Sequence, residues 1–250
     1  SCNIYYIQLG QRVGSQTFYN YFDAFGFTRR TGVDLPSETG FMQYYKANQL
    51  GEVQLASSAF GQAMAITPLQ MCTALAAAVN GGYLVTPHVV DKITDANGNV
   101  IEEIGANVRR QVISESTSNV IRQIMEYEVG AGTGGGKYAY VSGYRIGGKS
   151  GTSEQLNMDR RADGDYKKVA SFAAVLPADD PEIIVYVMLD DPNNARTDYS
   201  SLLAAPVVGN IISEIAPYLG IAADGEDRSQ TVVTVPNLVG TEWSSAQVQL

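Results

Sequence analysis

The run from Gly147 to Glu154, Gly-Gly-Lys-Ser-Gly-Thr-Ser-Glu, carries the residues with the clearest potential for chemistry. A lysine, two hydroxyl residues and a glycine on the edge of a sheet can place an ammonium, two hydroxyls and a backbone N–H around a carboxylate or a developing oxyanion. Gly151 lets a substrate backbone approach closely. Because one oxyanion donor is worth about 3 kcal/mol of a barrier, this strand predicts acyl-transfer chemistry; the alternative is a solvated Lys-Ser turn.

Three predicted strands form the sheet that must carry this run. They span residues 143–155, 169–176 and 182–189. The last two are almost continuously apolar, which predicts that both of their faces are covered. A helix over about 201–219 is expected to cover one face, and the last strand is expected to leave an unpaired apolar edge.

The first half of the chain is predicted to be mainly helical. Helices are expected over Asn3 to Gly14 and over Ser15 to about Gly26, whereas residues 29–52 show no clear period. Thr67-Pro68-Leu69-Gln70 combines a threonine cap, proline at the first helical position and a capping-box glutamine, and predicts a helix that ends at Gly81-Gly82. A strand pair over 83–103 turning at Asn97-Gly98 and a helix over about 114–129 follow.

Composition restricts the class of protein. The chain has 250 residues, 45% of them hydrophobic, which is enough for a substantial core. Its formal charge of −9 argues against nucleic acid as a partner. Two cysteines, Cys2 and Cys72, provide neither a disulfide framework nor a metal-ligand spacing, and we expect no metal or cofactor. No apolar run approaches the length expected of a membrane span.

Several residues that could suggest chemistry have a simpler structural interpretation. His88 follows a proline before a strand and is predicted to be structural rather than a general base. The pairs Asp179-Asp180 and Asp190-Asp191 lie beside prolines at strand ends, which favours turns over metal ligands. The glycine-rich run over 130–136 lacks the Gly-Lys-Ser/Thr ending of a phosphate-binding loop.

An ordered set of motifs resembles the class B penicillin-binding proteins, the monofunctional peptidoglycan D,D-transpeptidases. Ser1-Cys2-Asn3 resembles their second motif and Lys149-Ser150-Gly151-Thr152 their third. Between these lie similar segments: Phe60-Gly61-Gln62, Thr67-Pro68-Leu69-Gln70, Asn80-Gly81-Gly82-Tyr83, Pro87-His88 and Gly132-Thr133-Gly134. Val235-Pro236-Asn237-Leu238-Val239-Gly240 resembles the start of a PASTA module.

This resemblance implies an α/β fold of the penicillin-binding transpeptidase and serine β-lactamase type, with helices flanking an antiparallel sheet. The first family motif, a nucleophilic Ser-x-x-Lys, is absent, because none of the six lysines has a serine three residues before it. We therefore expect a fold that is incomplete at the N-terminus. Residues 1–220 would be the C-terminal part of a transpeptidase domain, 221–231 a linker and 232–250 the start of a truncated PASTA module.

The resemblance also implies a role for each site residue. Ser1 would belong to the proton-relay network around the missing serine and lysine, and Asn3 would contact that lysine and the substrate amide. Lys149 would support the electric field around the serine. The Ser150 and Thr152 hydroxyls would bind the substrate carboxylate beside Gly151. The Thr152 N–H would be one oxyanion donor.

The implied function is cross-linking of peptidoglycan through a serine acyl-enzyme. The implied partners are peptidoglycan stem peptides, β-lactam antibiotics and cell-wall synthesis proteins, and the implied location is the outer face of the cell membrane. Two alternatives stay open. One is a non-catalytic penicillin-sensing or muropeptide-binding module, and the other is a D,D-carboxypeptidase or β-lactamase of the same superfamily. We expect the isolated chain to be inactive, because it lacks the nucleophile.

Overall fold

A computed structural model describes residues 2–40, 42–130, 134–155, 160–162, 164–192 and 199–223. Its α-helices are α1 (Asn3–Val13), α2 (Ser15–Ala24), α3 (Glu52–Ala59), α4 (Pro68–Val79), α5 (Glu115–Gly130) and α6 (Ser200–Tyr218). Two short 3₁₀ helices are η1 (Ala47–Gln49) and η2 (Gly135–Ala139). The strands are β1 (Tyr83–Thr86), β2 (Lys92–Thr94), β3 (Val100–Glu103), β4 (Asn107–Gln111), β5 (Gly147–Glu154), β6 (Lys168–Leu176) and β7 (Ile183–Asp190).

The predicted three-stranded sheet is confirmed as an antiparallel sheet with the order β5-β6-β7. The first strand begins at Gly147 rather than at Gly143, because Gly143 adopts a φ of 82° in the preceding turn. Within the described part of the chain, β6 is the only neighbour of β5 and of β7, so each outer strand has one unpaired edge.

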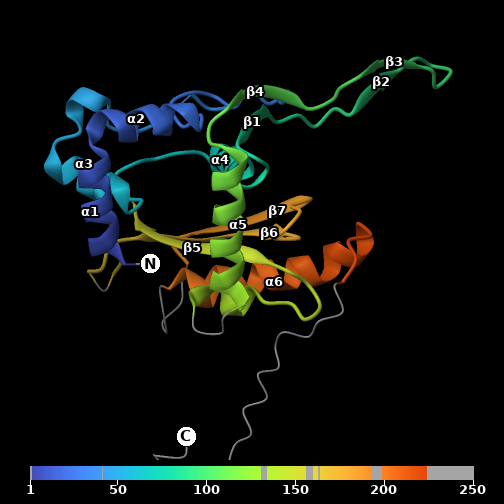
Figure 1. Ribbon diagram of the computed structural model, residues 1–250. Coiled ribbons are helices and arrows are strands. Elements are labelled where there is room, and N and C mark those ends of the chain that lie inside the picture. The colour runs from blue at the N-terminus through green and yellow to red at the C-terminus, as the bar shows by residue number, and fades with distance from the viewer. Residues whose placement is uncertain are drawn as a thin grey trace, which may run out of the picture.

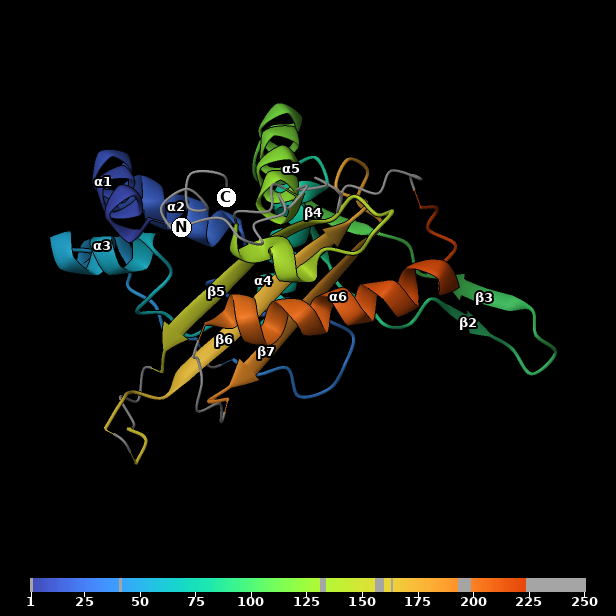
Figure 2. The ribbon, with the colours of Figure 1, turned by 90° about the horizontal axis from the view of Figure 1, so that it is seen from below.

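Helix α6 covers one face of this sheet, as predicted, and crosses it diagonally (Figure 2). The fully buried side chains of Phe172 and Leu176 from β6 meet Val208 and Ile212 from α6 in the main core. The same helix is long and apolar enough to cross a membrane by length and composition, which the sequence reading did not anticipate. The packing of α6 on the sheet explains why its side chains are apolar.

The opposite face of the sheet is covered at one end only. Met125 of α5 and Val79 of α4 pack there against Val175 of β6. Farther along the strands, Tyr186 is half-buried and Met188 is exposed. The expectation that both faces are covered was therefore wrong for this part of β7, and the open face forms the floor of a cleft.

The N-terminal helices form a separate layer beside this sheet (Figure 1). Helix α1 packs on α3, where a Cβ atom at Gly10 would lie only 2.5 Å from the Ala59 Cβ. Helix α3 was not predicted, because it has only eight residues and just one buried apolar side chain, Leu55, to mark its period.

Residues 83–111 form two strand pairs instead of the single predicted pair. The predicted turn at Asn97-Gly98 is confirmed and joins β2 to β3, with the Asp95 carboxylate accepting from the Asn97 N–H. Strand β1, however, pairs with β4, which the sequence reading missed. The β2–β3 hairpin consequently extends away from the body of the protein (Figure 1).

The structural interpretation of the isolated polar residues agrees with their contacts. Asp179 and Asp180 lie in the bend between β6 and β7, where Asp179 pairs with Arg145. Asp191 follows β7 and pairs with Arg161. His88 contacts the Val90 carbonyl through Nδ1 at 2.9 Å.

The predicted capping box at the start of α4 is confirmed. The Gln70 N–H donates to Thr67 Oγ1 at 3.1 Å, and the Thr67 N–H donates to Gln70 Oε1 at 2.9 Å. We expect Thr67→Ala to lower the free energy of unfolding by about 1 kcal/mol, because it leaves a helix N–H without its acceptor. Urea unfolding of this chain measures the effect, and Thr67→Ser, which keeps the hydroxyl, should lose much less. Equal losses in both variants would contradict the capping role.

Candidate active site

A cleft of about 690 Å³ opens between the sheet and the N-terminal helices. Its walls are the start of α1, the connection between α3 and α4, and strand β5, and its floor is the open sheet face of β6 and β7. Predicted site residues from two distant parts of the sequence line it: Asn3 from the N-terminus, and Lys149, Ser150 and Thr152 from β5. Gly151 lines it as well, so the structure brings together every predicted site residue that it describes.

Strand β5 presents different residues to the two faces of the sheet. Gly147 approaches Met125 and Val175 on the cleft face, whereas Gly148 approaches Phe172 on the α6 face. Because successive side chains of a strand alternate, Lys149 shares the cleft face with Gly147. A side chain at either glycine would collide with these neighbours, so both positions favour glycine.

Lys149 supplies the cation of the cleft. Its ammonium donates to the Ser150 carbonyl at 2.6 Å, while the residue as a whole is exposed. The surrounding protein atoms lower the pKa of Lys149 below its ordinary value by desolvating the charged form, and the Glu128 carboxylate opposes this effect. An ammonium that is partly stripped of water interacts more strongly with an anion in the cleft.

The unpaired edge of β5 points its N–H groups into the open. On the inner side, the Gly151 carbonyl accepts from Ser171 of β6 at 3.3 Å. The Thr152 carbonyl lies on the other side, since it accepts from Gln62 Nε2 at 3.3 Å. The N–H and C=O of a strand residue point the same way, so the Thr152 N–H is directed away from β6. This is the orientation that an oxyanion donor needs.

The Thr152 hydroxyl is held at the start of α6. It donates to Ser200 Oγ at 2.9 Å and accepts from the Ser200 N–H at 3.3 Å. The Ser200 side chain is buried, so this pair fixes the Thr152 rotamer. To bind a substrate carboxylate, the Thr152 hydroxyl would have to turn its O–H away from Ser200. The Ser150 hydroxyl needs no such change, because no hydrogen bond among the described residues holds it.

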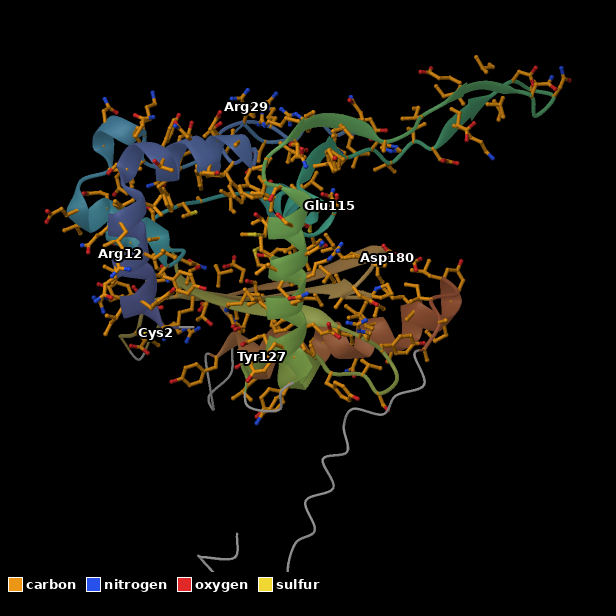
Figure 3. All side chains as sticks on the ribbon, viewed as in Figure 1. Cys2, Arg12, Arg29, Glu115, Tyr127 and Asp180 are labelled. Carbon is orange, nitrogen blue, oxygen red and sulfur yellow. The ribbon has the colours of Figure 1, made fainter. Side chains whose placement is uncertain are left out.

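The N-terminal part of the site is contributed by α1. Asn3 is the first residue of this helix and lines the cleft. Cys2, which precedes it, lies at the end of α1 nearest the sheet (Figure 3). Ser1, also predicted to be a site residue, lies outside the described residues.

Some residues that line the cleft or contact its lining were not predicted. Gln62 was noted only as part of a motif, without a role, and Ser200 carried no signal because its importance comes from the packing of α6. Tyr186, Met188 and Asp190 alternate along β7, and this period of two could have indicated a strand with one open face.

Comparisons with known proteins identify the family of this chain. The family described as "Penicillin binding protein transpeptidase domain" matches residues 1–213. Stage V sporulation protein D of Bacillus subtilis is 36% identical over 99% of the chain and 38% of its own length. The probable peptidoglycan D,D-transpeptidase FtsI of Caulobacter vibrioides is 33% identical over 95% of the chain and 39% of its own length. The chain thus spans less than two fifths of each of these relatives.

Solved structures share the fold. The crystal structure of penicillin binding protein 3 from Mycobacterium tuberculosis, complexed with aztreonam, superimposes with a TM-score of 0.75 at 28% identity. The match covers 88% of this chain and 50% of that one. The complex of the same protein with ampicillin gives a TM-score of 0.74. These matches establish the α/β transpeptidase fold predicted from the sequence.

Proposed function

Because this chain belongs to the penicillin-binding protein transpeptidase family, we propose that it provides one side of the active site of a peptidoglycan D,D-transpeptidase. The observation that carries this proposal is the meeting of Asn3, Lys149 and the Thr152 backbone at one cleft. The nucleophilic serine would come from a part of the protein outside this sequence, since no Ser-x-x-Lys occurs here.

The proposed reaction proceeds in two acyl transfers. The serine oxygen attacks the carbonyl carbon of the D-Ala-D-Ala bond, the serine proton passes to a base, and the peptide nitrogen leaves as D-Ala after it takes up a proton. The amine of a second stem peptide then attacks the serine ester. A new amide bond forms, the amine loses its proton and the serine hydroxyl is regenerated.

The proposed roles follow from the geometry of β5. The outward Thr152 N–H would stabilise the tetrahedral oxyanion, and Gly151 would let the substrate backbone approach. The Lys149 ammonium would stabilise the anionic groups in the cleft. Ser150 and Thr152 would bind the carboxylate, and the free Ser150 hydroxyl supports it as the first contact.

At the start of α1, Asn3 would contact the serine–lysine pair and the substrate amide, and Ser1 would join the proton relay. The position of Asn3 at the cleft supports this assignment. No cofactor takes part in the proposed chemistry.

The relatives also support proposals about partners and location. The substrates would be stem peptides, β-lactams would acylate the same serine, and other cell-wall synthesis proteins would act with the whole protein at the outer face of the membrane. We also retain the proposed division into a transpeptidase part (1–220), a linker (221–231) and the start of a PASTA module (232–250). Residues 224–250 lie outside the described part of the chain.

Intact-mass spectrometry after incubation with benzylpenicillin tests the function. The two samples are this chain and a version of the protein extended upstream through its Ser-x-x-Lys. We expect a penicilloyl adduct on the extended protein only. An adduct on this chain alone would assign a different nucleophile. No adduct on either sample would instead favour a non-catalytic binding module.

To separate a transpeptidase from a carboxypeptidase or a β-lactamase, the extended protein is given a D-Ala-D-Ala peptide with and without an acceptor amine. We expect the acyl group to reach the amine and the penicilloyl adduct to persist. Transfer to water alone would indicate a carboxypeptidase, and rapid loss of the adduct would indicate a β-lactamase.

A further inference from the structure

The outer edge of β5 has its carbonyl groups occupied by side chains of the protein itself. The Ser150 carbonyl accepts from the Lys149 ammonium, and the Thr152 carbonyl accepts from Gln62 Nε2. Ser150 and Thr152 flank Gly151 on the edge that faces the cleft. Because both carbonyls are already bonded, this edge offers mainly the N–H donors of Ser150 and Thr152. Such an edge favours binding of an anion, whereas a further strand would also need free carbonyl acceptors.

Gln62 is directed to this edge by the way α3 ends. Gly61 adopts a φ of 90°, its N–H donates to the Ser58 carbonyl at 3.0 Å, and the Gln62 N–H donates to the Ser57 carbonyl at 3.0 Å. This pair of bonds is a Schellman motif, which needs a left-handed residue and therefore favours glycine. The motif fixes the backbone of Gln62, so its side chain reaches β5, 90 residues farther along the chain.

We propose that Gln62 is a positioning residue: it holds the Thr152 carbonyl at the outer edge of β5 and so keeps the Thr152 N–H, which points to the same edge, directed at the oxyanion. The carbonyl and the N–H of Thr152 lie in the two planar peptide groups that meet at its Cα, so holding the carbonyl limits the rotation of one group relative to the other. Ser200 restrains the same residue through its hydroxyl. Gln62 therefore acts on Thr152 from the outer edge of β5 and Ser200 from the α6 side.

The inference rests on the proposed function, and its test has two parts. In the extended protein, benzylpenicillin binding and the first-order acylation step are measured separately for Gln62→Ala and Gln62→Glu. We expect Gln62→Ala to slow acylation by about 10- to 100-fold, because a misdirected N–H loses much of its effect on the transition state. Penicillin binding should change by less than about 3-fold, because the ground-state contacts remain. Gln62→Glu should lose more, since it places a carboxylate against the carbonyl and near the oxyanion.

The second part uses this chain and does not depend on catalysis. Amide hydrogen exchange, measured by NMR, should become faster in Gln62→Ala at Ser153, whose N–H belongs to the same peptide group as the Thr152 carbonyl and lies on the side of β5 that pairs with β6. Gln8→Ala, an exposed glutamine on α1, is the matched control and should alter neither exchange nor acylation.

Three outcomes would overturn the inference. Unchanged acylation in Gln62→Ala is one, and equal losses in binding and acylation, as expected from general structural damage, are another. If the unsubstituted extended protein forms no adduct, the proposed function fails and the catalytic role of Gln62 fails with it. The exchange data would still show whether Gln62 restrains the Thr152 carbonyl.

Discussion

Replacing Lys149 by glutamine is expected to slow acylation of the extended protein by benzylpenicillin by about 10²- to 10³-fold. A group that stabilises developing charge in a water-poor site typically has an effect of this order. Lys149 provides the ammonium on the cleft face of β5, and its donation to the Ser150 carbonyl also keeps that acceptor occupied. Time-resolved intact-mass spectrometry of the penicilloyl adduct measures the rate.

Lys92→Gln is the matched control, because Lys92 is an exposed lysine on the β2–β3 hairpin, away from the cleft. It should acylate at the rate of the unsubstituted protein. If Lys149→Gln acylates at that same rate, Lys149 does not act in the reaction. If Lys149→Gln loses its cooperative thermal melting, Lys149→Met repeats the test with a side chain of similar length.

The pH profile offers a second readout of the same lysine. Partial desolvation by neighbouring protein atoms lowers the pKa of Lys149, so its charge is lost at a lower pH than that of an ordinary lysine, whose pKa is 10.5. If the ammonium is required, acylation should decline as the pH rises through this lowered pKa. A decline that persists unchanged in Lys149→Gln would assign the titration to another group.

Phe172→Ala is expected to lower the free energy of unfolding by about 3–5 kcal/mol. This is the usual cost of removing a fully buried aromatic ring, because apolar contacts are lost and a cavity remains. Phe172 has no exposed surface and lies under Gly148, where a Cβ atom would come within 2.7 Å of its ring. The ring therefore supports β5 directly beneath the lysine.

Urea unfolding of the chain measures this loss. Val120→Ala, on the exposed face of α5, is the control and should change stability by no more than about 0.5 kcal/mol. Gly148→Ala should also destabilise the chain, by about 1–3 kcal/mol through overpacking, and Phe172→Leu should restore part of that loss. A loss below about 1 kcal/mol for Phe172→Ala would contradict its place in the core.

Where local sequence decides the structure, the sequence predicted it well. The start of α4 was predicted from four residues, because a capping box and proline at the first helical position act through neighbouring backbone groups. The apolar strands and α6 were recognisable because buried elements need apolar side chains. The pairing of the short strands was mispredicted. Strand β1 pairs with β4, which lies beyond the β2–β3 hairpin, and the residues of β1 alone do not specify this partner.

The site divides in the same way. The sequence by itself determined which residues could carry the proposed chemistry, because Asn3 and Lys149-Ser150-Gly151-Thr152 have side chains and a glycine suited to acyl transfer. Only the tertiary structure decided that Gln62 reaches the Thr152 carbonyl and that Ser200 holds the Thr152 hydroxyl. These contacts join segments 90 and 48 residues apart, and their geometry depends on how α3 and α6 pack around β5. Local sequence patterns cannot specify a packing that the whole chain determines.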